Sequence, residues 1–326
     1  VAFSVTMVAL TLTSGQYGPK ILRNFLEDSS SKVTLGLFLG TYVYTLIVLT
    51  GYTQADHPRF TVFISLILAF LALVAFVGFI HRTATDLQAD QVIYRIGAQL
   101  QHALTAFTAE AEASDRTTTT LTWRRAARSR RAFPVAATGG GYIQTIDYPG
   151  LVNWCDQNNC LLQVRVRAGD FVVSGECLFK VFRRSAEGLE SAVADLNAHI
   201  VLGPIRTPIQ DPEHAITQLN QLAARALSPG VNDPGTAVTC IDWFSLGLAQ
   251  IIDRDMPGCI FLDQNQHPRL LARVSTFRGI MKSIYTPLRQ FANTDSAVVI
   301  CLLESLCRLA ELTRRPVRLS NLATHA

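Results

Sequence analysis

Two long apolar stretches dominate the first quarter of the chain. The run TVFISLILAFLALVAFVGFI, from Thr61 to Ile80, holds no charged residue over twenty positions. At about 1.5 Å of rise per residue, a helix of this length matches a bilayer core of about 30 Å. The run VTLGLFLGTYVYTLIVLTG, from Val33 to Gly51, is more polar but also uncharged. Both stretches predict transmembrane helices.

The chain opens on a shorter apolar segment, VAFSVTMVALTLTSG, which begins with Val rather than Met. Its apolar part ends at Ser14 and Gly15 and is too short to cross a bilayer alone. We interpret it as part of a first transmembrane helix and expect one more span upstream. A cleaved signal peptide is the alternative, but its cleavage pattern is not visible. Residues 1–82 are therefore predicted to form a transmembrane domain.

The pattern becomes amphipathic after residue 82. Thr83–Glu112 has the apolar spacing of a helix, and the basic tract WRRAARSRR follows at Trp123–Arg131. We interpret residues 83–134 as an amphipathic helix and a basic linker. The arginines either contact anionic lipid headgroups, at about 1 kcal/mol each near such a surface, or belong to a solvated linker.

Residues 135–184 carry the signals of a small β unit. A strand is predicted at Tyr142–Ile146, LQVRVR alternates, and turns fall at Ala168-Gly169-Asp170 and Ser174-Gly175-Glu176. The pattern GDFVVSGECL resembles hairpins of barrel-sandwich domains such as lipoyl and biotinyl carriers. The Asp-Lys or Met-Lys of a modification turn is missing, and Lys180 lies in the strand itself. We therefore expect a structural β unit without a covalent cofactor.

Residues 185–326 are predicted to form a helical bundle, because apolar positions recur at helical spacing in segments too polar to cross a bilayer. The expected helices are Ala186–His199, Pro212–Leu227, Pro234–Asp253, Pro268–Ala292 and Ser296–Thr313. The predicted fold class is thus an α-helical integral membrane domain plus a cytoplasmic α+β region, made of the barrel-sandwich-like β unit and this bundle.

Basic residues set the expected orientation. Lys20, Arg23 and Lys32 precede the first complete span, and a larger basic group follows residue 81, whereas the linker between the spans holds only Arg59. Positive residues favour the cytoplasmic side, so the large C-terminal region is predicted to be cytoplasmic.

Composition adds three constraints. A mean hydropathy of +0.24 with 17% charged residues is unusual for a soluble protein. The formal net charge of +4 is too small to indicate a nucleic-acid partner. Seven scattered cysteines without a CxxC pair indicate reduced, mostly buried thiols, although Cys155 and Cys160 are near enough in sequence for a disulfide.

Two Asp-Pro pairs mark helix starts. Asp211-Pro212 and Asp233-Pro234 each place a carboxylate at the N-cap and a proline at the first helical position. If the two starts lie side by side, their free N–H groups would form an anion-binding pocket. The candidate ligand or interface residues are Arg206, Thr207, Gln210, Asp211, Asn232 and Asp233. Plain helix punctuation is the alternative.

The span Val33–Gly51 has two distinct faces. Gly36 and Gly40 form a GxxxG pair with Tyr44 on the same face, which predicts close helix packing and a homo-oligomer. A second face carries Thr34, Thr41 and Thr45, which either line a polar path or bond to their own backbone.

Catalytic motifs are missing from the sequence. The seven histidines show no metal-ligand spacing, and there is no GxSxG, HExxH, Walker or GxGxxG pattern. His214, beside Asp211, is the one candidate base and is better explained as a helix-surface residue. We expect no enzyme activity, no catalytic residue, no cofactor and no metal.

Several segments of the sequence match the pattern of a known family: QYGPKILRNFLEDSSSKVTLGLFLGTYVY, GGGYIQTID, RAGDFVVSGECL, IRTPIQDPEHAITQLNQLAARALSPGVNDPGTA and CIDW. The chain resembles the bacterial predicted membrane protein family known as domain of unknown function 2254, over nearly its whole length. The resemblance implies a protein of the bacterial inner membrane, with four N-terminal spans and a large cytoplasmic region. It implies no activity.

Two functional hypotheses follow. The first is a membrane-anchored scaffold or accessory protein that binds a partner or ligand through its cytoplasmic domain. The alternative is a homo-oligomeric channel or transporter gated by that domain. The expected partners are the lipid bilayer, further copies of the chain and a second membrane protein, and nucleic acid is not expected.

Overall fold

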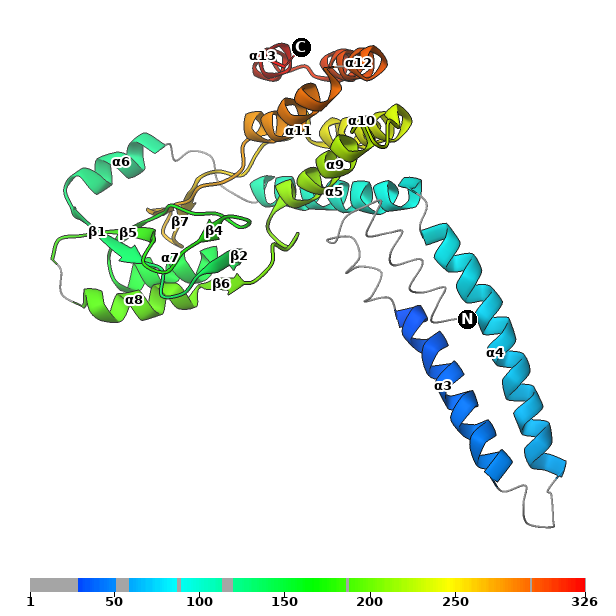
Figure 1. Cartoon of the computed structure of the whole chain (residues 1–326). Coiled ribbons are helices and arrows are strands. Elements are labelled where there is room, and N and C mark those ends of the chain that lie inside the picture. The colour runs from blue at the N-terminus through cyan, green and yellow to red at the C-terminus, as the bar shows by residue number, and fades with distance from the viewer. Residues whose placement is uncertain are drawn as a thin grey trace. The chain divides into compact units, whose positions relative to one another are not determined.

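The computed structural model describes residues 29–50, 59–86, 89–112, 120–185, 188–293 and 295–325. The chain divides into two compact units, Val1–Val92 and Ile93–Ala326. Two apolar helices belong to the first unit, and both sheets belong to the second (Figure 1). The apolar opening segment, Lys20, Arg23 and the linker between the two predicted spans lie outside the described residues.

The two predicted apolar helices are confirmed as α3 (Ser29–Thr50) and α4 (Arg59–Asp86). They pack on each other, with Phe38 and Phe76 edge to face at a centroid distance of 5.8 Å. Lys32–Thr50 and Phe60–His81 are long and apolar enough to cross a membrane, by length and composition. Most of their large apolar side chains are exposed, for example Phe70 at 65%, whereas the core helix of a soluble protein would be mostly buried.

The second unit contains a five-stranded sheet in the order β1-β5-β3-β8-β7 and a three-stranded sheet in the order β4-β2-β6. β3 and β8 are parallel, and the other neighbours are antiparallel. The strands are β1 (Arg131–Ala136), β2 (Gly141–Ile146), β3 (Leu161–Val164), β4 (Phe171–Val172), β5 (Cys177–Arg183), β6 (Ile200–Gly203), β7 (Ile260–Leu262) and β8 (Pro268–Leu271).

Helices α7 (Tyr148–Gln157) and α8 (Leu189–Ala198) bury their apolar faces with these sheets. Their Leu151 and Leu196 join Ile143 and Phe179 in one fully buried core. Helix α6 (Thr120–Arg128) instead packs Trp123 into a separate cluster with Leu161 and Ile260. The region is therefore α+β with mixed sheets.

The predicted β unit at residues 135–184 was too narrow. Its turns at Gly169 and Gly175 are confirmed, with φ of +89° and +90°. However, β1 starts at Arg131, and β6, β7 and β8 come from the part predicted as purely helical. The sheets are two open sheets completed by distant strands, and the barrel-sandwich arrangement is not confirmed. The basic linker is also partly regular, since α6 and the start of β1 lie within it.

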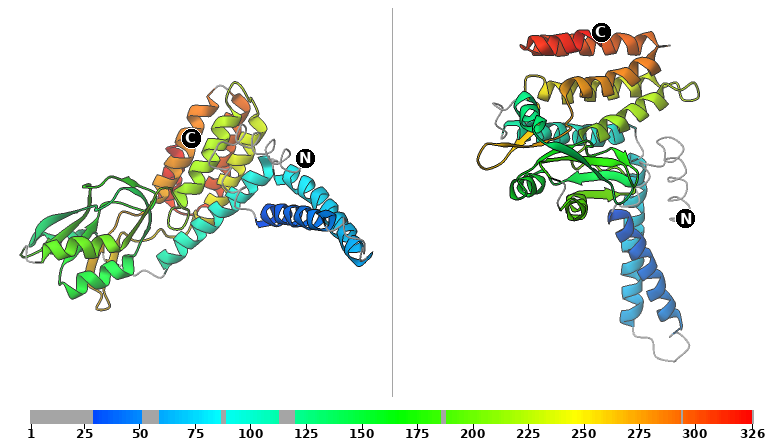
Figure 2. Two further views of the ribbon diagram at one scale, coloured as in Figure 1. Left: turned by 60° about the horizontal axis from the view of Figure 1, so that its bottom comes forward. Right: turned by 90° about the vertical axis from the view of Figure 1, so that its left-hand side faces the viewer.

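The bundle consists of α9 (Pro212–Ala226), α10 (Pro234–Ile251), α11 (Phe277–Ala292), α12 (Ser296–Leu312) and α13 (Pro316–Ala323). Its helices stack in layers on one side of the unit, and the strands gather on the other (Figure 2). Helix α5 (Ala89–Glu112) joins the bundle through a close approach, because a Cβ on Gly97 would lie 2.3 Å from Trp243 Cδ2. Gly247 of α10 receives Leu100 and Leu104 of α5 in the same way.

The helix predicted from Pro268 is wrong in its first part. Proline at a first helical position resembled a helix start, but Pro268–Leu271 forms β8, which pairs with β3 and β7. The helix α11 begins only at Phe277, capped by Thr276, whose hydroxyl accepts from Gly279 N at 3.1 Å. Pairing with a strand about a hundred residues earlier overrode the local helix signal.

All seven cysteines are free. Cys155, Cys160 and Cys240 are buried, but Cys177, Cys259 and Cys301 are partly exposed and Cys307 is exposed. The expectation of mostly buried thiols therefore holds for three of the seven.

Candidate functional site

A highly connected charged group of the second unit is the guanidinium of Arg167, in the loop after β3. It donates through Nη1 to Glu213 Oε1 at 2.6 Å and to Ser275 Oγ at 2.9 Å, and through Nη2 to Glu213 Oε2 at 2.8 Å. Burial opposes its charge, but the hydrogen bonds and charge of Glu213 outweigh burial and raise the pKa of Arg167. This clamp joins the loop after β3, the first turn of α9 and the loop before α11.

A second contact docks the glycine turn after β3 onto the start of α9. Asp211 is buried, caps α9 by accepting from Glu213 N at 3.1 Å, and forms an ion pair with Arg206. A Cβ on Gly169 would lie 2.2 Å from Asp211 Oδ2, and the φ of +89° at Gly169 independently favours glycine. The RAGD turn and the IQDP helix start therefore meet at one place.

Gln210 fastens the same helix start to β2. Its Oε1 accepts from Ile146 N at 2.8 Å, and its Nε2 donates to Ile146 O at 3.1 Å. The Thr207 hydroxyl is buried and has no hydrogen-bond partner in the described part of the chain. Four of the six predicted site residues, Arg206, Thr207, Gln210 and Asp211, thus lie in the loop that leads into α9.

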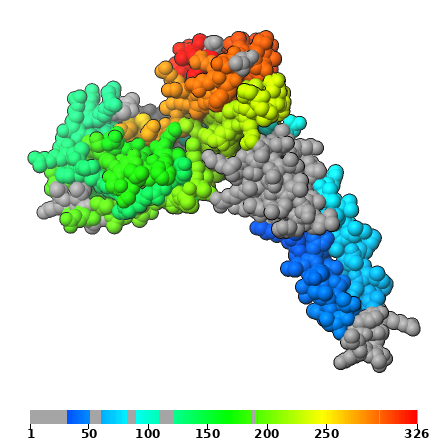
Figure 3. Space-filling model, viewed as in Figure 1, coloured from blue at the N-terminus to red at the C-terminus, as the bar shows by residue number. Residues whose placement is uncertain are grey.

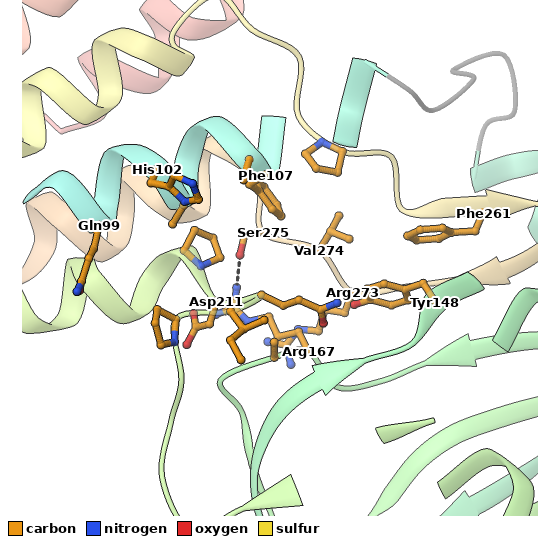
Figure 4. A pocket seen from close by; sticks show the side chains of 18 residues that line it. Gln99, His102, Phe107, Tyr148, Arg167, Asp211, Phe261, Arg273, Val274 and Ser275 are labelled. Carbon is orange, nitrogen blue, oxygen red and sulfur yellow. Dashed lines mark hydrogen bonds between the residues drawn. The ribbon is translucent and has the colours of Figure 1, made fainter. Parts of the chain in front are cut away.

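A pocket of about 390 Å³ opens beside this loop. Its wall is largely apolar, and Figure 4 shows His102 and Phe107 of α5 on one side and Arg167 and Asp211 opposite. The lining residues are Gln99, His102, Ala103, Ala106, Phe107, Tyr148, Arg167, Ala168, Pro208, Ile209, Gln210, Asp211, Pro212, Pro257, Phe261, Arg273, Val274 and Ser275.

Arg273 is the least neutralised charge at this pocket. Its side chain is 62% exposed, and Nη1 lies 3.6 Å from Asp170 Oδ2. Asp170 is shared, because its Oδ1 also lies 3.7 Å from Arg167 Nε. By contrast, Glu213 and Asp211 have close ion pairs with Arg167 and Arg206. A mostly apolar pocket with a loosely paired guanidinium suits an apolar ligand that carries one anionic group.

Asn232 and Asp233 do not contribute to this pocket. Asp233 caps α10 by accepting from Thr236 N and Thr236 Oγ1 at 3.2 and 2.6 Å, and its own N–H donates to Ala226 O at the end of α9. The two Asp-Pro starts are therefore separated by α9, whose 15 residues span roughly 22 Å. The condition for one shared anion pocket is not met.

Removal of the Asp233 side chain tests whether this residue serves only as the N-cap of α10. Asp233→Ala should lower the free energy of unfolding by about 1 kcal/mol. Hydrogen bonds from the Thr236 hydroxyl and backbone hold the pKa of Asp233 below its usual value. Its stabilisation is therefore present above about pH 4 and fades as pH falls through the lowered pKa. Denaturant unfolding at neutral and acid pH measures this, with the exposed, non-capping Asp242→Ala as control. Equal losses at both pH values would contradict it.

The sequence missed the residues at the centre of the site. Arg167 and Glu213 stand in the segments RAGD and QDPE, but neither was singled out, and Ser275 and Arg273 belong to no motif; the Arg167–Ser275 contact spans 108 residues. Arg167 entered the sequence analysis only as the last residue of the alternating segment LQVRVR. Among the described residues, no group of His, Cys, Asp and Glu could hold a metal ion.

The two faces of α3 lie differently with respect to α4. Thr34, Thr41 and Thr45 fall on the half-buried stripe that recurs at helical spacing with Phe38, on the side of α4. The Thr45 hydroxyl donates to Thr41 O at 3.0 Å, its own backbone. By contrast, a Cβ added to Gly36 or Gly40 would have no neighbouring atom within 4 Å. Tyr44, predicted on the same face, is half-buried. The glycines therefore take no part in the α3–α4 contact.

The protein thus combines two apolar helices near its N-terminus with an α+β region of mixed sheets. The chain belongs to the family described as predicted membrane protein (DUF2254), whose model matches residues 1–308, and this confirms the resemblance. It is 26% identical over 331 aligned positions to the uncharacterized proteins MT1328 of Mycobacterium tuberculosis (strain CDC 1551 / Oshkosh) and Mb1321c of Mycobacterium bovis. Each alignment covers 98% of this chain and 62% of the relative's length. No solved structure matches the chain significantly.

Proposed function

We propose that the chain is a membrane-anchored binding protein whose α+β region takes a small, largely apolar ligand with one anionic group. The pocket beside Arg273 carries this proposal, because concave, mostly apolar walls with a few convergent polar groups are typical of ligand sites. Its floor is held by the Arg167–Glu213 clamp and the Gln210–Ile146 contact, so the pocket is preformed.

The membrane part of the proposal rests on α3, α4 and the family. The lengths of the apolar segments in α3 and α4 match the thickness of a bilayer. The distribution of basic residues along the sequence favours a cytoplasmic position for the α+β region, at a bacterial inner membrane. Further spans and self-association belong to the same proposal. A channel or transporter gated by the α+β region is the alternative function, and the threonine stripe on the side of α4 gives it no separate support.

The ligand site can be tested with a fluorinated aromatic acid. We expect 4-(trifluoromethyl)benzoate to bind the detergent-purified full chain, detected by broadening of its fluorine NMR signal. Arg273→Gln should weaken the benzoate about tenfold, the loss expected for one charge-assisted hydrogen bond, and leave the neutral 4-(trifluoromethyl)benzyl alcohol nearly unaffected.

Two matched substitutions on α5 separate pocket binding from adsorption. Ala106 lines the pocket, whereas Ala98 is exposed on the same helix and does not line it. Ala106→Trp should abolish binding, and Ala98→Trp should preserve it. Equal binding by both variants, or no binding by the parent chain, would show the proposed site to be wrong.

A further inference from the structure

Helix α6 presents arginines on the surface because its apolar face is already used. Trp123 is 3% exposed and packs edge to face on Phe182 at 5.1 Å. Ala127, one turn later, is buried in the same cluster. The arginines between them, Arg124 and Arg125, must therefore project away from the sheet, as does Arg128.

More arginines lie where α6 leads into β1 and where β5 ends. Arg131 is paired directly with Arg183 in the β1–β5 register, although like charges in opposite positions destabilise a sheet. Burial and the nearby charges of Arg269 and Arg184 lower the pKa of Arg130. We call this set the arginine corner: Arg124, Arg125, Arg128, Arg130, Arg131, Arg183 and Arg184.

The arginine corner has no acidic partner among the residues that the structure describes. Six other arginines of the second unit form ion pairs with acidic side chains: Arg167, Arg206, Arg269, Arg273, Arg308 and Arg315. No residue of the arginine corner makes such a pair within the described part of the chain, and the nearest polar contact is Arg130 Nη1 to Asn159 O at 3.1 Å. Among the described residues, this set therefore forms a local excess of positive charge that suits an anionic surface.

We propose that the arginine corner docks the α+β region onto a bilayer surface rich in anionic phospholipid. Guanidinium groups match phosphate in geometry, and each arginine near an anionic surface contributes about 1 kcal/mol. Leu121, on the first turn of α6, is 63% exposed and supplies an apolar contact beside the charges. In Figure 3, α6 lies at the surface at the end of the unit away from α10 and α12.

Lipid fits this surface better than nucleic acid. Proteins that bind single strands interleave basic residues with exposed aromatic rings, but Trp123 is buried and Phe182 is packed against it. In addition, a chain anchored by α3 and α4 meets lipid headgroups at high effective concentration. The docking rests on the membrane location proposed above, and the two are tested separately.

The experiment places the full chain in nanodiscs of phosphatidylcholine alone or mixed with phosphatidylglycerol, and follows hydrogen–deuterium exchange of residues 120–131. Incorporation into either nanodisc tests the membrane location. We expect exchange about tenfold slower with phosphatidylglycerol, because the arginines contribute about 1 kcal/mol each. The difference should vanish at about 0.5 M salt, where the Debye length is about 4 Å.

Matched triple variants complete the test. Arg124→Glu, Arg125→Glu and Arg128→Glu together should remove the protection, whereas the same change at exposed Arg278, Arg308 and Arg314 should preserve it. If the reversed charges disturb folding, the variant with glutamine at positions 124, 125 and 128 replaces the glutamate variant. Unchanged hydrogen–deuterium exchange in β3 and β5 verifies that each variant is folded. Equal exchange in both lipids, or protection by a duplex DNA oligonucleotide but not by phosphatidylglycerol, would overturn the proposal.

Discussion

Arg167→Met should lower the free energy of unfolding by about 3 kcal/mol, the scale measured when one partner of a buried ion pair is removed. The substitution leaves the Glu213 carboxylate, only 13% exposed, without the two guanidinium hydrogen bonds that now satisfy it. Because the clamp joins α9 to the loop before α11, ligand binding should be lost together with stability. Thermal or urea unfolding of the detergent-purified chain measures the effect.

Two comparisons isolate the ion pair as the cause. In the double variant Arg167→Met with Glu213→Leu no unpaired charge remains, so much of the stability should return. Arg308→Met is the control, because its contact with Asp242 is 3.9 Å long and both side chains are more than half exposed. A loss no greater for Arg167→Met than for Arg308→Met would refute the proposed role of the clamp.

Gly97→Val is expected to cost about 3 kcal/mol, the upper range for overpacking a filled site. A Cβ at this position would lie 2.3 Å from Trp243 Cδ2 and 2.4 Å from its Cε3. The indole also packs on Tyr94 at a centroid distance of 5.5 Å and therefore has little room to retreat. Since α5 forms one wall of the pocket, its displacement from α10 should also weaken ligand binding.

The same substitution at the next position is the control for backbone effects. Ala98 is exposed, so Ala98→Val changes helix propensity without a clash and should cost well under about 1 kcal/mol. The rescue variant Gly97→Val with Trp243→Leu should recover part of the loss if the indole is the obstacle. Tryptophan fluorescence and circular dichroism during unfolding distinguish these outcomes, and no rescue would place the strain elsewhere.

The features around α9 and α10 show which parts of the structure follow from neighbours along the chain and which from distant contacts. The Asp211-Pro212 and Asp233-Pro234 helix starts were predictable, since a cap and its helix lie within three residues of each other. The two starts do not lie side by side, as a shared anion pocket would require, because the length of α9 separates them. Gly169 was correctly placed in a turn, but its contact with Asp211 was not foreseeable from either segment.

The pocket itself could not be predicted. Its polar residues, such as Arg167, Arg273 and Ser275, stand in ordinary sequence surroundings, and they meet only because β8 lies parallel to β3. Likewise, the basic tract at Trp123–Arg131 suggested a linker, whereas the burial of Trp123 turns it into a helix with arginines on one side.

Features with local causes could be predicted from the amino-acid sequence: two long apolar helices, helix starts set by Asp-Pro pairs, and glycine turns. The family could be recognised in the same way. The strands that complete the sheets, the arginines that are paired and the face of α3 that meets α4 became visible only in the folded chain. Periodicity and capping depend on neighbours along the chain, whereas ion pairs and strand partners depend on residues a hundred positions away, whose meeting no short pattern encodes.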